Sequence, residues 1–322
     1  MAKRFSQRAF RERAEEHERS SLSTWATLAA ETKGRDRSEE PDPLRTAFAD
    51  DLDRLQATAA FRALAGKSAR LPARLRRTRL LETLDVARVA CALGRALQLN
   101  PDLVEAIATG HALGSPPFGD AGGEALSTFT VTPFHPGEQA SRVVERAVVG
   151  GRDLNLTWEV RDGLLHHDPS GPPGVTTEAQ AVRLAVGIVR AVAPVRDLIV
   201  DGLLGAADVP TSVRGALGPA PQRWTSALVQ RAAEVSTDGP EVGLDVETTT
   251  AVAALQAFTA ERGAQDEERA DHDRAVHVLR SILVFELEGD GDGDAAGAVD
   301  RVVAATDAEA LARYRRLFEP DA

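Results

Sequence analysis

The chain has 322 residues, which suits one large domain or two modest ones, and aromatic residues make up only 4% of it. Its formal net charge of −11 argues against a general nucleic-acid binder, and its single cysteine, Cys91, excludes a disulfide framework and a cysteine metal site. Alanine, leucine and valine supply most of the apolar content. We therefore expect an all-α fold packed through aliphatic side chains.

The first 44 residues are mixed in charge and close with EEPDP, which is typical of an arm that precedes a compact core. The N-terminus contains no apolar segment and no stretch reaches membrane-spanning length, so we expect no signal peptide, no membrane anchor and a cytoplasmic location. We divide the chain into an N-terminal arm (1–44), a core (45–204) and a helical C-terminal region packed on the core (205–322).

Two central helices are predicted next to each other in the core. The segment TLDVARVACALGRAL, residues 83–97, places apolar side chains at helical spacing. Asn100 and Pro101 then supply an N-cap and a first-turn proline for a second helix, which we expect to end at Gly114. Because the link is short, the two helices should pack antiparallel, which brings Glu82 toward His111.

A further helix is expected where LNLTWEVRDGLLHHD, residues 154–168, runs into a polar end. Thr177 and Gln180 form a capping-box pattern for the next helix, which Pro194 should stop or kink. The glycine- and proline-rich segment 205–223 is typical of a linker or loop.

The C-terminal third is predicted to be helical again, with a second capping-box pattern at Thr306 and Glu309. The sequence GDGDGD, residues 289–294, should separate the last two helices. It resembles the start of a calcium loop, but position twelve of that loop is Arg301, where a bidentate glutamate is needed. We interpret it as a flexible acidic linker.

Arginine outnumbers lysine by 35 to three, which indicates a genomic bias, so basic clusters carry less weight as evidence for binding sites. The most concentrated basic stretch is RLPARLRRTR, residues 70–79. It lacks interleaved aromatic residues for base stacking, so a nucleotide or anion site or a subunit contact is favoured over nucleic acid. Composition bias alone also accounts for it.

Several segments resemble, in the right order over roughly residues 21–200, the deoxyguanosine triphosphate triphosphohydrolase family of the HD superfamily. The resemblance implies an all-α HD-domain fold for the core, release of triphosphate from deoxynucleoside triphosphates, and assembly as hexamers or tetramers. The segments are RSEEPDPLRTAFADDLDRL, AFRAL, RTRLLETLDVARVACALGRALQLNPDLVEAIATGHALGSPPFGDAG, GEQASRVVE, LNLTWEVRDGLL and EAQAVRLA.

The metal ligands that the resemblance implies are largely replaced in this chain. The first family ligand is a histidine in a pattern like RTRLTHTLEV, and its position is taken by Glu82. The family's His-Asp pair falls on His111 and Ala112, and its last aspartate ligand falls on Val186. A hydrolytic HD site needs about four nitrogen and oxygen ligands to hold a metal that activates water. We therefore expect no bound metal and no cofactor.

The family's catalytic histidine and glutamate fall on Asp120 and Gly123, with Glu124 adjacent, so a general acid or base is also missing. His111 itself is then interpreted as a helix-end histidine near the C-terminal dipole. Other residues could approach the pocket by analogy with the fold, but no sequence spacing links them to Glu82 or His111. These are His135, His166, His167 and Asp168. The cluster Asp271, His272, Asp273 and His277 is interpreted as a solvated helix face.

Basic residues that suit phosphate oxygens remain at several family positions. They are Arg54, Arg62, Lys67, Arg77 and Arg79. Against binding, Ala63 replaces an arginine and Arg190 replaces a tyrosine of the family pattern where substrate contacts are expected. Interhelical and surface ion pairs are the alternative role for these arginines.

The sequence as a whole favours a catalytically degenerate relative of the triphosphohydrolases, a nucleotide- or anion-binding regulatory or assembly subunit. One alternative is an active deoxynucleoside triphosphate triphosphohydrolase with a non-standard site for a divalent metal such as Mn, Mg, Fe or Co. Another is a helical scaffold that binds no nucleotide. The expected partners are a deoxynucleoside triphosphate or another anion, and further copies of the chain or an active relative in an oligomer, without membrane or nucleic acid.

Overall fold

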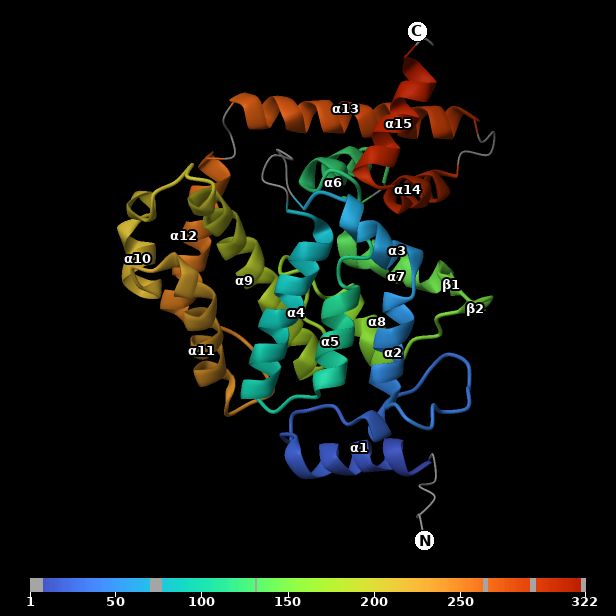
Figure 1. Ribbon diagram of the computed structural model, residues 1–322, viewed down its shortest axis with the longest axis vertical. Coiled ribbons are helices and arrows are strands. Elements are labelled where there is room, and N and C mark those ends of the chain that lie inside the picture. The colour runs from blue at the N-terminus through green and yellow to red at the C-terminus, as the bar shows by residue number, and fades with distance from the viewer. Residues whose placement is uncertain (1–7, 70–76, 131, 263–265, 290–293, 320–322) are drawn as a thin grey trace.

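The computed structural model describes residues 8–69, 77–130, 132–262, 266–289 and 294–319. Over these residues the chain is built from helices and one short hairpin, so the all-α fold is confirmed (Figure 1). The helices are α1 (Arg8–Ser21), α2 (Ala47–Gln56), α3 (Ala59–Ala63), α4 (Arg79–Ala96), α5 (Pro101–Gly110), α6 (Asp120–Ser127), α7 (Pro136–Arg146), α8 (Trp158–Leu165), α9 (Thr177–Val200), α10 (Thr211–Leu217), α11 (Trp224–Ser236), α12 (Val246–Arg262), α13 (Asp266–Gly289), α14 (Ala295–Ala304) and α15 (Asp307–Phe318). The hairpin pairs β1 (Val148–Val149) with β2 (Arg152–Asp153), and 3-10 turns cover Ala29–Glu31, Leu64–Gly66, Ala206–Asp208 and Pro221–Arg223.

The larger hydrophobic core lies between α2, α4, α5, α8 and α9. The side chain of Asn100 accepts hydrogen bonds from the backbone of Asp102 and Leu103, and Pro101 occupies the first turn, so α5 begins where the sequence predicts. A Cβ added at Gly94 of α4 would lie 3.2 Å from Val104 of α5, so the two helices approach closely. Helices α11 and α12 pack on α9, α10 packs on α12, and all three join the same core.

A second hydrophobic core joins α6 to the C-terminal helices. Leu126 of α6 packs with Leu279 and Leu283 of α13, and Val302 of α14 and Ala310 of α15 complete the cluster. Figure 1 shows α13, α14 and α15 together over α6, at the end of the molecule opposite α1. The C-terminal chain therefore covers the side of the core on which α6 begins.

The segment after α1 packs on the main core through buried carboxylates. The carboxylate of Glu178 in α9 accepts hydrogen bonds from the backbone and side chain of Thr27 and from the backbone of Asn100. Glu18 accepts a hydrogen bond from the backbone of Ala29 at 2.7 Å. These bonds hold the segment that contains Thr27 and Ala29 beside the start of α5. The division of the chain into residues 1–44, 45–204 and 205–322 stays a prediction.

Three helix boundaries differ from those expected. Helix α5 ends at Gly110 and not at Gly114, because His111 begins a series of turns that leads into two prolines. Helix α9 is capped by Thr176, whose hydroxyl accepts from the backbone of Ala179, and not by Thr177. The same helix passes Pro194 and continues to Val200, because the residues flanking the proline are buried in the core, which offsets the hydrogen bond lost there.

The segments expected to be loops also contain order. Within 205–223, α10 forms because Val213 and Leu217 are buried, so the segment is not merely a linker. The sequence 289–294 lies between α13 and α14 and not between the last two helices, and its residues 290–293 lie outside the described part of the chain. The capping box of Thr306 and Glu309 is confirmed at the start of α15.

Candidate functional site

His111 lies at the end of α5 and is 3% exposed. Its Nδ1 is 2.7 Å from the carbonyl oxygen of Ala108, and because a carbonyl only accepts, Nδ1 carries the proton. The neighbouring Ala112 is 4% exposed and faces the main core. We call the surrounding cluster the His111 corner, and its residues are Arg79, Glu82, His111, His167, Asp168 and Arg190.

His167, at the end of α8, lies against His111 with the ring centroids 5.4 Å apart in an edge-to-face arrangement. It is also buried and also bonds through Nδ1, to the carbonyl of Leu164 at 2.7 Å. Burial lowers the pKa of His111 to about 4, and the charges of Arg190 and Arg79 add to the shift. Burial lowers the pKa of His167 to about 3, so both rings are neutral at pH 7.

The first turn of α4 contributes an internal ion pair to the corner. Arg79 Nη1 lies 2.6 Å from Glu82 Oε2, and both residues are buried. The capping Thr78 begins the helix, so residues three apart face the same side and can pair. The carboxylate of Glu82 is therefore bonded to Arg79. The Nε atom of Arg79 is buried and has no hydrogen-bond partner.

Helix α9 contributes a second ion pair. Arg190 Nη1 lies 2.9 Å from Asp168 Oδ2, one turn beyond Val186, which is fully buried. Burial alone would raise the pKa of Asp168, but Arg190 and the hydrogen bonds from Ser170 outweigh burial and hold the pKa well below its ordinary value. Asp168 therefore stays ionised and paired.

The residues of the corner do not fit a divalent metal. Of the four positions aligned with family ligands, Ala112 and Val186 are hydrocarbon, and Glu82 is held by Arg79. No group of three or more histidine, cysteine, aspartate or glutamate side chains is arranged to hold a metal within the described residues. A stable site needs more donors than His111 can add, so no chemical step is assigned to a metal here.

A cavity of about 140 Å³ opens beside the corner, between α4, α9 and the start of α6. Asp120, aligned with the family's catalytic histidine, lines it and is exposed. Gly123, aligned with the family's glutamate, contributes no side chain, and the neighbouring Glu124 bonds His272 of α13 at 2.8 Å. The cavity is lined by Ala69, Arg77, Arg79, Glu82, Asp120, Val189, Arg190, Ala193, Pro194 and Asp197.

Of the five basic residues expected to bind phosphate, the structure places Arg77 and Arg79 together on this cavity. Arg77 is already paired: it makes a bidentate bond to Asp197, with distances of 2.6 and 2.9 Å, and a third bond to Asp85 at 2.8 Å. Arg196 of α9 adds a further bond to Asp85. The rest of the basic stretch, residues 70–76, lies outside the described residues.

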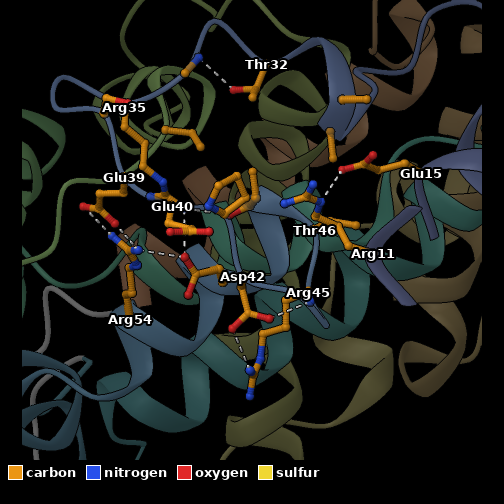
Figure 2. A pocket seen from close by; sticks show the side chains of 18 of the residues that line it. Arg11, Glu15, Thr32, Arg35, Glu39, Glu40, Asp42, Arg45, Thr46 and Arg54 are labelled. Carbon is orange, nitrogen blue, oxygen red and sulfur yellow. Dashed lines mark hydrogen bonds and ion pairs between the residues drawn. The ribbon is translucent and has the colours of Figure 1, made fainter. Parts of the chain in front are cut away.

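The other three basic residues do not line the cavity. Lys67 is 1% exposed, and its Nζ donates to the carbonyls of Ser115 at 2.8 Å and Val303 at 2.6 Å, while burial lowers its pKa to about 8. Arg62 is exposed and donates to the carbonyl of Ala57 in its own segment. Arg54 lines a separate hollow near α1, where it pairs with Glu39 and Asp50 (Figure 2).

The histidines considered as replacement ligands are dispersed. Only His167 meets His111, whereas His166 bonds the backbone and carboxylate of Asp162 within α8. His135 lines a different cavity of about 260 Å³ beside α7. On α13, His272 bonds Glu124 and His277 bonds Tyr314, so this face is part of the contact with α6 and α15 and is not only solvated.

One residue that anchors the corner escaped the sequence analysis. Asp307, the first residue of α15, accepts hydrogen bonds from the backbone of Ser68 and of Phe118, each at 2.9 Å. Phe118 and Gly119 both have positive φ, of 62° and 61°, so the turn into α6 is a tight one that needs outside support. The capping box predicted the helix but carried no signal for these distant partners.

No helix in the described part of the chain combines the length and apolar character needed to cross a membrane. No family model matches the sequence. A solved structure of a hypothetical protein from Aquifex aeolicus is similar to 84% of this chain and 71% of its own, at 15% identity and a TM-score of 0.48. That likeness is too low to carry an argument.

Curated relatives cover nearly the whole chain. A deoxyguanosinetriphosphate triphosphohydrolase-like protein from Caldanaerobacter subterraneus subsp. tengcongensis is 34% identical over an alignment that covers 96% of each chain. One of the same name from Clostridium perfringens is 32% identical over 96% of this chain and 98% of its own. The chain therefore belongs to the family of deoxyguanosinetriphosphate triphosphohydrolase-like proteins.

Proposed function

We propose that this protein is a non-hydrolysing member of its family, which acts by binding and assembly and not by turnover. The observation that carries the proposal is the state of the donor set: Ala112 and Val186 offer no ligand atoms, and Glu82 is bonded to Arg79. Metal-assisted hydrolysis needs a cation that polarises the phosphate and activates water. Without such donors the corner lacks the metal-bound water that this kind of hydrolysis uses as its nucleophile.

The ligand that suits the cavity is a phosphate group. Arg79 offers a buried Nε without a partner, and the side chain of Arg190 is 34% exposed, so both can still donate to an anion. The cavity volume of about 140 Å³ is below the roughly 300–1,000 Å³ typical of pockets that enclose a drug-sized ligand. A deoxynucleotide would therefore enter phosphate first, with its sugar and base outside.

Assembly with further copies of the chain or with an active relative in the cytoplasm is the second part of the proposal. The chain aligns with 96% of one relative described above and 98% of the other. A subunit that keeps the fold but lacks turnover can contribute an interface or a regulatory ligand site to an oligomer.

The direct test is release of triphosphate from the four deoxynucleoside triphosphates, with Mn²⁺ or Mg²⁺, against a control without protein. We expect no release above that control, and no rescue by Ala112→Asp alone because the other ligands remain absent. Turnover by the unmodified chain would overturn the proposal. Elemental analysis of protein prepared without chelators tests the same point independently, and near-stoichiometric metal lost in His111→Ala would contradict it.

Binding is tested by a thermal-shift panel of inorganic phosphate, triphosphate, deoxynucleotides and ribonucleotides. A ligand at about a hundred times its Kd adds roughly 2.7 kcal/mol to the free energy of unfolding. We expect the shift to disappear in Arg79→Met and to persist in Arg54→Met, whose guanidinium lies in the other hollow. If no anion raises the melting temperature, the binding part of the proposal is wrong and the protein is a scaffold. If light scattering shows a monomer, the assembly part is wrong.

A further inference from the structure

The His111 corner contains two guanidinium groups where its family pattern leads one to expect a bound cation. Arg79 pairs with Glu82 at 2.6 Å, and Arg190 pairs with Asp168 at 2.9 Å. Both arginines line the same cavity, and the charges of both reach His111. The corner thus has internal positive charge on two sides of its histidine pair.

We propose that Arg79 and Arg190 neutralise the carboxylates of this corner, and that Arg190, which stands where the family pattern has a tyrosine, ties the end of α8 to α9 and keeps a divalent metal out. The loss of the aspartate at Val186 and the gain of the Arg190 ion pair then form a single change. The inference concerns how the corner is held together, and it stands whether or not the cavity binds a phosphate ligand.

The geometry of α9 supports this coupling. Arg190 follows Val186 by four residues, so the two side chains share one face of the helix. Where the family pattern carries an aspartate ligand, this chain has the hydrocarbon side chain of Val186. One turn later, the guanidinium of Arg190 pairs with Asp168, which follows the end of α8. The charge of Arg190 already acts on His111, so it would also act on a metal held by His111 and would disfavour its binding.

The chemistry of the two histidines agrees with the same interpretation. Each ring uses Nδ1 to bond a carbonyl of its own helix end, and both are buried and neutral. Neutral rings, unlike imidazolium ions, do not compete with the guanidinium groups for the carboxylates, and the two rings pack edge to face. Positive charge at the corner is therefore confined to the arginines.

The first test asks whether missing ligands or resident cations exclude a metal. Carboxylates are restored in Ala112→Asp/Val186→Asp, and Arg190→Gln is then added. The matched control adds Arg196→Gln, because Arg196 lies on the same helix, has a side-chain exposure of 33% against 34%, and pairs with Asp85 away from His111. Mn²⁺ affinity is measured by calorimetry on variants shown to be folded by circular dichroism.

We expect Arg190→Gln to tighten Mn²⁺ binding by about tenfold or more over the carboxylate variant, and Arg196→Gln to leave it within about twofold. Equal affinities with and without Arg190 would overturn the proposal, as would an absence of Mn²⁺ binding in all folded variants. An equal gain from Arg196→Gln would reduce the effect to general charge and would also contradict it.

A second test introduces no new carboxylate into the core, so its variants are expected to fold. Thermal unfolding is compared for Arg190→Gln, Asp168→Asn and the double variant, with and without a chelator. We expect each single variant to lower Tm by at least about 3 °C, the double to lower it by clearly less than the sum, and the chelator to change nothing. Additive effects, or a Tm that falls when chelator is added to the unmodified protein, would overturn the proposal.

Discussion

Two regions of the molecule bury carboxylates, and they use them differently. One is the N-terminal clasp, which consists of Glu18, Asp51, Glu159 and Glu178 and the segment 27–35 that they hold. The other is the His111 corner. Every carboxylate of the clasp accepts a backbone N–H group, and Asp51 also pairs with Arg35, whereas both carboxylates of the corner, Glu82 and Asp168, pair with an arginine.

The contrast teaches that a buried carboxylate indicates function only through its partner. Glu159 accepts from the backbone of Lys33 at 2.7 Å, and Asp51 accepts from the backbone of Thr157 at 2.9 Å, as capping and turn residues do. A backbone N–H group is part of the fold, so a carboxylate that accepts from it has a structural partner in the folded chain. A side-chain cation can be exchanged for another cation more readily than a backbone donor, and both carboxylates of the corner are held by side-chain cations that line a cavity.

The largest effect is expected in the clasp. Glu178→Ala removes one acceptor of three hydrogen bonds, two to Thr27 and one to the backbone of Asn100, and leaves the donors buried. We expect the free energy of unfolding to fall by about 4 kcal/mol, measured by urea denaturation. Glu178→Gln keeps one oxygen and should lose about half as much. A loss below about 1 kcal/mol for the alanine variant would show that the clasp does not hold this segment.

The next effect is a pH dependence that belongs to the corner. The pKa values of His111 and His167 are about 4 and about 3 in the folded protein, below the roughly 6.5 of an unfolded chain. The unfolded state therefore takes up protons first as the pH falls. The stability gained by keeping the rings neutral is full above about pH 6.5 and is lost below it, by up to about 1.4 kcal/mol per pH unit for each ring.

Urea denaturation between about pH 7 and pH 5 measures this slope. Replacing one ring, as in His111→Gln, should make the slope shallower by the share of one proton. A slope that does not respond to His111→Gln would mean that other groups dominate the acid sensitivity and that the ring is not held neutral by burial.

The fold was largely predictable because helix signals are local. The N-cap at Asn100 and the capping box at Thr306 are decided by neighbours within one turn, and both are confirmed. Tertiary packing decides what local signals do not: α9 continues past Pro194, where a stop or a kink was expected, because buried neighbours surround the proline, and Leu84, within the apolar segment 83–97, is 57% exposed. Periodicity identifies an apolar face but does not decide what covers each position.

The site was predictable only in part, for a related reason. Alignment with a family pattern placed Glu82 and His111 near one corner, and the short link between α4 and α5 agrees with that. The partners of the arginines could not be predicted, because Arg77 finds Asp197 across 120 residues and Arg190 finds Asp168 across 22. An ion pair between distant residues leaves no spacing in the sequence.

A smaller effect sharpens the comparison inside the corner. Arg79→Met should cost about 2 kcal/mol, since it leaves Glu82 buried without its cation. Adding Glu82→Leu should restore most of this loss, because a buried ion pair and a well-packed apolar pair of similar volume are often close in stability. If the double variant were less stable than Arg79→Met, Glu82 would have a second partner that outweighs Arg79.

The smallest effect is expected for Arg62, which matches the family pattern but donates a hydrogen bond to the carbonyl of Ala57, five residues earlier. Arg62→Gln should change the free energy of unfolding by no more than about 0.5 kcal/mol, as is usual for exposed side chains without buried partners. It should also leave any phosphate-induced thermal shift intact, in contrast to Arg79→Met, because only Arg79 of the two lines the cavity. Loss of the shift in Arg62→Gln would extend the phosphate contacts beyond the His111 corner to α3, and alignment with the family would then have located a binding residue that the cavity geometry does not.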